Sequence, residues 1–199
     1  TRAEIEAHGW DEPDIVLVSG DAYIDHPSFA AGLLARLLEH AGYRVAVLPQ
    51  PDWRTVDPWR ALGRPRLFYG VTAGNMDSMI NHYTANRKRR NDDAYSPGGR
   101  IGLRPDRATM PYCQRAREAY KGVPIIAGGV EASLRRLAHS DYWSDKVRRS
   151  ILLDAKADLV VFGMGESAVL EITRRIEEGE TTRDLRGMRG VAYALGASE

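Results

Sequence analysis

Short apolar runs recur along the chain and alternate with polar segments and helical patterns. The runs are rich in Val, Ile and Leu, and they lie at residues 15–18, 45–48, 67–69, 123–127, 159–162 and 191–195. Short runs without an inside/outside alternation are typical of parallel strands that are covered on both faces. We therefore predict that each run forms a buried strand.

Amphipathic helices are predicted between these strands. Apolar residues from 29 to 41 recur three or four positions apart, and Gly42 follows as a helix stop. The same spacing is present at 168–176, and Val147, Ile151 and Ala155 indicate a further helix. The alternation predicts an α/β fold with a doubly wound, mostly parallel sheet, a flavodoxin-like three-layer sandwich with strand order 2-1-3-4-5.

Residues 84–105 interrupt this alternation. They contain no apolar period, but they include the basic run 87–90, the acidic pair Asp92 and Asp93, and a Pro-Gly-Gly turn. Loops of this length in a compact domain are usually functional or disordered. We expect an inserted loop whose basic run is solvated and mobile, within a single domain that spans residues 1–199.

Composition narrows the classes of function. Lysine plus arginine (28) nearly balances aspartate plus glutamate (27), so the net charge of +1 gives no general attraction to nucleic acid or to an anionic membrane. We find no leader pattern and no apolar run long enough to cross a bilayer, and we expect a cytoplasmic protein. The opening at Thr1 and the end at Glu199 suggest a segment of a longer polypeptide.

The only cysteine is Cys113. An iron–sulfur cluster needs roughly three or four thiolates, and a closed zinc site needs roughly four ligands. We therefore expect no metal site in this segment, and any metal chemistry must take place elsewhere.

Polar residues and glycines follow the predicted strands, where a doubly wound sheet binds its ligands. The first strand is followed by Asp21, Tyr23, Asp25 and His26. A histidine beside an aspartate can act as an acid, a base or a metal ligand. Alternatively, Asp25 caps the next helix and His26 only packs on the turn.

The second and third strands are followed by further candidates. Asp52 and Trp53 follow the second strand, and the indole of Trp53 either stacks on a ligand or covers the end of the sheet. Thr72, Gly74 and Asn75 follow the third strand. Free backbone N–H groups there could hold an anion, although a tight, well-capped turn would use similar residues.

Glycines and one glutamate follow each of the next two strands. The candidates are Gly128, Gly129, Glu131 and Ser133 after the fourth strand, and Gly163 and Glu166 after the fifth. Each glutamate either complements a helix dipole or faces a ligand. All these residues together form the predicted substrate or cofactor edge.

Several long strings resemble one family. They are SGDAYIDHPSF, LPQPDWR, GVTAGNMDSMINHYTA, RPDRAT, GGVEASLRRLAHSDYWSDKVRRSIL and DAKADLVVFGMGE. From about Gly9 onward, the chain resembles the N-terminal region of the YgiQ family of radical SAM proteins. Strings of this length are more specific than a short motif.

The resemblance implies a longer protein in which a CxxxCxxC motif follows this domain. That motif would hold a [4Fe–4S] cluster that cleaves S-adenosylmethionine. The chain contains no such motif. We therefore expect no cofactor in this segment and no catalysis by the segment alone, whereas the full-length protein would be a radical SAM enzyme of unknown substrate.

The resemblance also implies a role for the predicted edge. The layout is similar to the cobalamin-binding-type domains that precede many radical SAM barrels, but the stretch 25–29 departs from their Asp-x-His-x-x-Gly signature. The leading hypothesis is an accessory domain whose edge, with Asp21, His26, Asn75, Glu131 and Glu166, faces the C-terminal barrel of the same chain and shapes its substrate pocket.

Two alternative functions stay open. One is a module for cobalamin or another flat cofactor, in which Gly74, Gly128, Gly129 and Gly163 allow close backbone approach. The other is docking to RNA through residues 87–90 and 148–149, which would depend steeply on salt. The near-zero net charge argues against RNA.

Overall fold

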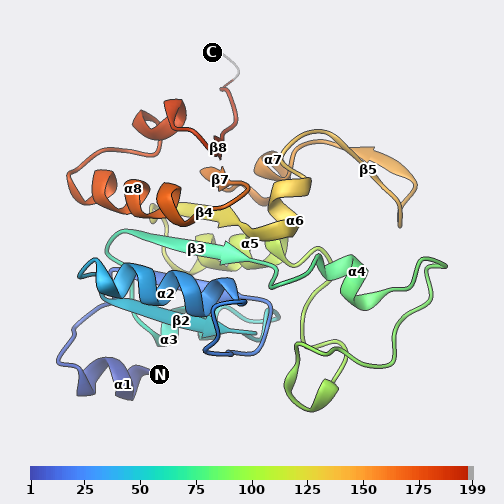
Figure 1. The fold of residues 1–199 in the computed structure, drawn as a ribbon, viewed down its shortest axis with the longest axis horizontal. Helices are drawn as coiled ribbons and strands as arrows, with labels where there is room; N and C mark the ends of the chain where they lie inside the picture. Colours follow the sequence, from blue (N-terminus) through green and yellow to red (C-terminus); the bar gives the residue numbers. More distant parts are fainter. Residues whose placement is uncertain (197–199) are drawn as a thin grey trace.

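A computed structural model of the chain describes residues 1–196 and has a six-stranded sheet at its centre (Figure 1). The strands are β1 (Ile15–Ser19), β2 (Val45–Pro49), β3 (Phe68–Thr72), β4 (Ile125–Gly128), β7 (Leu159–Val161) and β8 (Val191–Ala192). Their order is β2-β1-β3-β4-β7-β8; the first five strands of this order are parallel, and β8 pairs antiparallel with β7. The predicted α/β class and the 2-1-3-4-5 order of the parallel strands are confirmed.

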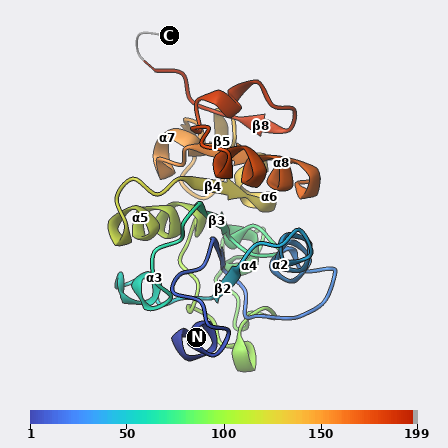
Figure 2. The ribbon, with the colours of Figure 1, turned by 90° about the vertical axis from the view of Figure 1, so that its left-hand side faces the viewer.

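Helices cover both faces of the sheet (Figure 2). They are α1 (Arg2–Ala7), α2 (Ala30–His40), α3 (Asp57–Ala61), α4 (Ser78–His82), α5 (Thr109–Ala119), α6 (Gly129–Leu134), α7 (Ile151–Ala155) and α8 (Glu166–Glu177), with short 3₁₀ helices at Pro97–Gly99 and Asp184–Gly187. Helices α2 and α8 lie on one face, and α3, α5 and α7 lie on the other. No helix within residues 1–196 is long and apolar enough to cross a bilayer.

Alternate residues of each central strand enter two separate apolar cores. Leu17 and Phe68 pack under α2 and α8, whereas Val16 and Tyr69 pack under α3 and α5. All of them are buried, because helices cover both faces of the sheet. This explains why the strands read as continuous apolar runs in the sequence.

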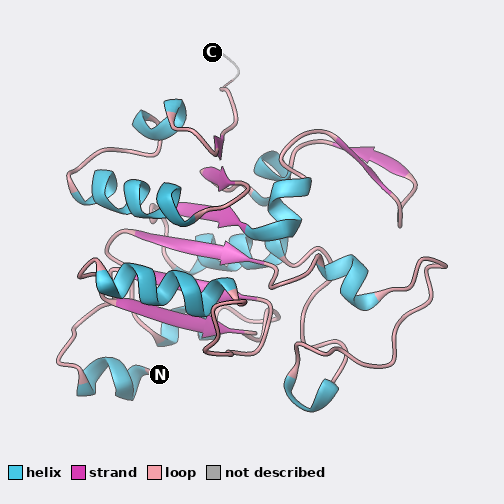
Figure 3. Ribbon diagram, in the orientation of Figure 1, coloured by secondary structure: helices cyan, strands magenta, loops and turns pink. Residues whose placement is uncertain are grey.

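The prediction of a helix that begins at Val147 is wrong. Residues 139–148 form a hairpin of β5 (His139–Asp141) and β6 (Lys146–Arg148), and α7 begins only at Ile151 (Figure 3). Val147 lies on β6 and is 80% exposed. Ser150 caps the start of α7 by accepting the Leu152 amide, so the helix does not extend back to Val147. The helical spacing between Val147 and Ile151 is therefore a coincidence.

The long segment between β3 and α5 is mainly loop (Figure 3). The basic run 87–90 is exposed, in agreement with a solvated loop. Later residues of the segment are not solvated: Asp93 and Arg104 are both almost fully buried. This half of the loop is therefore part of the packed structure.

Candidate functional site

The carboxyl ends of the strands share one side of the molecule, which also carries α4, α6 and the β5–β6 hairpin (Figure 1). We call this side the carboxyl edge and define it as the segments that follow β1, β2, β3, β4 and β7. These segments are residues 20–29, 50–56, 73–108, 129–150 and 162–165. All the predicted site residues except Thr72, Gly128 and Glu166 lie in them, and these three lie at their borders.

Asp21 is buried at the end of β1, where protein groups surround its carboxylate. Its Oδ1 lies 2.9 Å from Arg104 Nη1, and its Oδ2 accepts a 2.6 Å hydrogen bond from the Asn75 amide. Arg104, whose side chain is fully buried, also donates to the Ala73 carbonyl and lies 3.2 Å from Asp93. The three charged residues, which we call the Arg104 cluster, fasten the loop to the ends of β1 and β3.

Burial and hydrogen bonds shift the pKa values of the two acidic residues in the Arg104 cluster. Burial raises the pKa of Asp21, and the nearby Arg104 only partly offsets this effect. Burial also acts on Asp93, but hydrogen bonds from Asn81 and the Tyr95 amide outweigh it and lower the pKa of Asp93. The cluster therefore places two acidic side chains on one guanidinium.

Gly74 belongs to the same packing arrangement. Its φ is +113°, and a Cβ at this position would lie 2.1 Å from Asp21 Oδ1. The backbone of Gly74 thus approaches the carboxylate more closely than any other residue type would allow. The absence of its side chain serves an internal contact.

Glu131 is 1% exposed and joins the starts of two helices. One carboxylate oxygen accepts hydrogen bonds from the Ser78 amide at 2.9 Å and from the Ser78 hydroxyl, at the first residue of α4. The other accepts from the Thr109 amide at 2.9 Å, at the first residue of α5. The carboxylate therefore complements the starts of α4 and α5, in addition to lying in the first turn of its own helix.

The candidates after β1 lie in an exposed turn. Asp25 pairs with Arg36 at 2.6 Å, and this hydrogen bond lowers the pKa of Asp25. His26 Nδ1 accepts the Ser28 amide at 3.1 Å. Helix α2 begins without a side-chain cap, so Asp25 does not cap it. Tyr23 is also exposed, and the pocket that Glu166 lines does not include Tyr23, Asp25 or His26.

The candidates after β2 lie on the other face of the sheet. Asp52 is exposed and pairs with Arg54. Trp53 packs against the core under α3 and α5, and its carbonyl accepts a 2.9 Å hydrogen bond from Arg115 Nε. Trp53 therefore covers that core, away from the remaining candidates.

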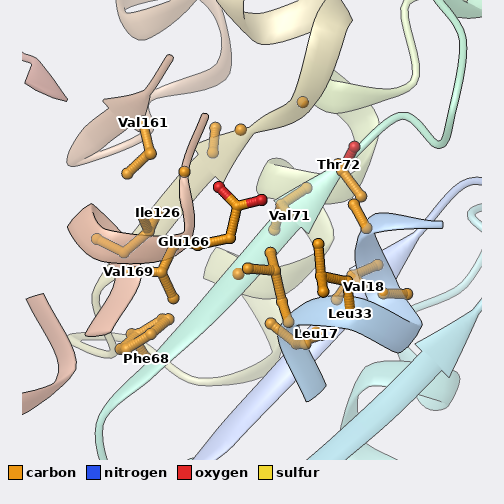
Figure 4. Close-up of a pocket in the computed structure, with 18 of the residues that line it drawn as sticks. Leu17, Val18, Leu33, Phe68, Val71, Thr72, Ile126, Val161, Glu166 and Val169 are labelled. Atoms are coloured by element: carbon orange, nitrogen blue, oxygen red, sulfur yellow. The ribbon is translucent and has the colours of Figure 1, made fainter. Parts of the chain in front are cut away.

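An open cleft of about 190 Å³ brings five of the predicted residues together (Figure 4). It lies between α2 and α8, over β1, β3, β4 and β7. Its lining includes the predicted residues Thr72, Gly128, Gly129, Gly163 and Glu166. Apolar side chains form most of the remaining lining, and no histidine lines the cleft.

A smaller hollow beside this cleft is lined by Asp21, Thr72, Gly74 and Asn75. Ser133 lines neither hollow; its carbonyl accepts a hydrogen bond from Arg136.

A tight contact shapes one rim of the larger cleft. Gly129 has a φ of +79°, and a Cβ there would lie 2.3 Å from Thr72 Oγ1. The Thr72 hydroxyl accepts the Gly74 amide at 3.2 Å. The glycines after β3 and β4 thus allow two strand ends to meet closely. This agrees with the alternative interpretation of Thr72 and Gly74, in which they form a tight turn rather than an anion-binding site.

The residues present do not fit an iron–sulfur cluster. Cys113 lies on the buried face of α5, and burial raises its pKa to about 12. Within residues 1–196, no three His, Cys, Asp or Glu side chains are grouped so that they could hold a metal ion. A cluster in a longer protein must take its ligands from outside these residues.

The basic residues that could contact RNA are mainly engaged in internal contacts. The Arg87 guanidinium lies 4.6 Å from the centre of the Tyr142 ring, and Arg148 pairs with Asp141 at 2.6 Å. Arg149 pairs with Asp154. These contacts reduce the positive charge that is free to attract phosphate.

A histidine–aspartate pair that was not predicted from the sequence lies at the carboxyl edge. His82, 3% exposed, has its Nδ1 2.7 Å from Asp106 Oδ1, and the Tyr83 hydroxyl donates to Asp106 Oδ2 at 2.8 Å. The His82 hydrogen bond is the main cause of a lowered pKa at Asp106. Because the partners are 24 positions apart, no local motif indicates the pair.

Large apolar side chains are exposed mainly on the carboxyl edge. Within residues 1–196, nine of twelve such residues lie there. The nine are Tyr23, Ile24, Ile80, Val130, Leu134, Leu137, Tyr142, Val147 and Met164. Met164 is 86% exposed, and Val147 is nearly as open. Where such side chains adjoin one another, exposed apolar surface marks an interaction site.

The fold and the edge define the chain as a flavodoxin-like α/β domain with an apolar cleft and an exposed apolar edge. The whole chain, residues 1–199, matches the model of the family described as Radical SAM N-terminal, and the chain belongs to this family.

Relatives place this domain in longer proteins. A UPF0313 protein of Rhodopseudomonas palustris is 61% identical over 192 residues, which cover 96% of this chain and 28% of that protein. A UPF0313 protein of Geobacter sulfurreducens is 60% identical over 196 residues, which cover 98% of this chain and 32% of that protein. The chain thus spans about a third or less of the length of these relatives.

Proposed function

We propose that this chain is the N-terminal accessory domain of a longer radical SAM enzyme of the YgiQ type. Its carboxyl edge docks onto the catalytic barrel in the remainder of that protein and shapes or covers the substrate pocket. The barrel would hold a [4Fe–4S] cluster that cleaves S-adenosylmethionine. Family membership and the greater length of the relatives support this proposal.

The concentration of exposed apolar side chains on the carboxyl edge is the observation that carries the proposal. Val130 and Leu134 lie on the outer side of α6, and Leu134 is 62% exposed. Burial of apolar area on docking contributes roughly 25 cal/mol per Å². These side chains therefore favour a partner that covers the ends of the strands.

Internal hydrogen bonds hold this surface in place. Glu131, on the inner side of α6, binds the starts of α4 and α5. Asp77 caps α4 through the Met79 and Ile80 amides and pairs with Arg135 at the end of α6. The exposed side chains of α4 and α6 thus have defined relative positions before any partner arrives.

Hydrogen exchange tests the docking surface. We expect the α6 amides to exchange more slowly in a protein that carries this chain at the length of its relatives than in the 199-residue chain. Leu134→Asp should reverse this protection and reduce reductive cleavage of S-adenosylmethionine. Leu153→Asp, at an exposed leucine of α7 outside the edge, is the matched control. Equal exchange of α6 in both proteins would contradict the proposal.

A further inference from the structure

We propose that the cleft between α2 and α8 binds a flat, mainly apolar organic group that carries an ammonium or N–H donor. Glu166 is the residue that accepts this donor. The site belongs to this domain alone and goes beyond the docking role of the carboxyl edge.

The dimensions of the cleft fit a ring system. Its volume of about 190 Å³ exceeds the roughly 150 Å³ of an engineered apolar cavity that takes up benzene. A two-ring compound is therefore of suitable size. Leu17, Phe68 and Ile126 of the sheet face the cleft, and Val169 of α8 and Leu33 of α2 line it from the helices. Such a lining favours an apolar body over a polar one.

Gly70 lines the cleft from the sheet, next to Leu17. It is the middle residue of β3, and a Cβ there would lie only 2.8 Å from Leu17 Cδ2. Glycine in a strand interior weakens the strand and often marks a close approach of a ligand or another backbone. Here the missing side chain lets Leu17 of β1 pack closely against the backbone of β3, and Gly70 itself forms part of the sheet face of the cleft.

Glu166 supplies the chemical preference. Among residues 1–196 it is the only charged side chain that lines the cleft, and Figure 4 shows its carboxylate among the apolar lining residues. The two buried candidate acids, Asp21 and Glu131, have their carboxylates engaged by neighbouring protein groups. Within residues 1–196, the Glu166 side chain has no hydrogen bond or ion pair of this kind. A free carboxylate beside apolar surface is a strong acceptor for a cationic or N–H donor and disfavours an anion.

Three fluorinated probes that share the same two-ring system test this preference. They are 5-fluorotryptamine, which is cationic, 5-fluoroindole, which is neutral, and 5-fluoroindole-3-propionate, which is anionic. Fluorine NMR of each probe is recorded with the 199-residue chain and with a protein that carries it at the length of its relatives. We expect 5-fluorotryptamine to bind most tightly and the anion to bind least tightly, in both proteins.

Two variants assign the binding to the cleft. Glu166→Gln should weaken 5-fluorotryptamine roughly three- to fivefold, as for a partly exposed ion pair, and should affect 5-fluoroindole less, because the glutamine carbonyl still accepts its N–H. Glu171→Gln, elsewhere on α8, is its control. Ala31→Phe, at the helix α2 side of the cleft, should abolish binding of all probes, whereas Ala41→Phe at the far end of α2 should not.

Three results would overturn the proposal. One is the absence of binding by any probe. Another is binding that Ala31→Phe leaves intact, because the probe would then lie elsewhere. The third is binding by the 199-residue chain but not by the longer protein, because the protein's own side chains would then fill the cleft. None of these results bears on the exchange of the α6 amides, so the docking proposal is tested separately.

Discussion

Replacing Arg104 with methionine tests how the loop is held on the sheet. The substitution preserves an unbranched side chain but removes the only cation of the Arg104 cluster. Asp21 and Asp93, both buried, would then face each other without a counter-ion. Removal of one partner from a buried ion pair typically costs about 3–5 kcal/mol. We expect a loss of this size, a large share of the roughly 5–15 kcal/mol that stabilises an ordinary domain.

The loss should depend on pH in a defined direction. Burial already raises the pKa of Asp21 in the presence of Arg104, and without the guanidinium the pKa of both carboxylates should rise. A pKa that is higher in the folded state means that protonation favours folding. The destabilisation by Arg104→Met should therefore be greatest near neutral pH and should decrease as the pH falls toward 4.

Urea unfolding at several pH values, followed by circular dichroism, measures this effect. Arg174→Met is the control, because Arg174 forms only exposed pairs on α8 and should change stability little at any pH. A loss below about 1 kcal/mol, or a loss that is the same at pH 4 and pH 7, would refute the reasoning that the cluster is a buried and charged anchor.

Three further predictions concern other parts of the domain. Hydrogen bonds from Arg44 and Arg66 outweigh the effect of burial and lower the pKa of Asp14 to about 2. Asp14 should therefore contribute stability above pH 4 that is lost as the pH falls toward 2. In urea unfolding, Asp14→Asn should remove this acid dependence, and the control Asp52→Asn should retain it. Cys113 should react with a thiol reagent only after unfolding, and rapid labelling of the native chain would contradict its burial. Gly129→Ala should lower the melting temperature by several degrees, because it adds a strained φ and a clash; an unchanged value would show that the turn can relax.

The sequence predicts the five parallel strands well because burial on both faces leaves a direct mark. The run 191–195, also predicted as a buried strand, forms only the short, partly exposed β8. A strand such as β1 has no exposed position, so its apolar run is continuous and its limits are clear. The 147–155 segment shows the opposite case. Three residues there have helical spacing, but Val147 is on an exposed hairpin that is stabilised by Asp141, which accepts hydrogen bonds from Arg107 and Arg148. Such long-range support leaves no periodic signal in the sequence.

The candidate site could be predicted as a region but not as a set of contacts. The topology of a parallel sheet requires the segments after β3, β4 and β7 to meet, and Thr72, Gly129 and Glu166 do line one cleft. Which carboxylates are free could not be read from the sequence. Glu131 finds partners 53 and 22 positions away, and Glu166, which likewise lies in the first turn of the helix that follows its strand, has none within the described residues.

The Arg104 cluster has a consequence for the rate and strength of any association at the carboxyl edge. A loop that becomes ordered only on binding loses roughly 1–2 kcal/mol of backbone entropy per residue at that moment. Because Arg104 and Asp93 already fix the second half of the loop to the sheet, that part of the cost falls within the folding of the domain itself. A partner would meet a preformed surface, and association need not wait for the loop to find its bound conformation.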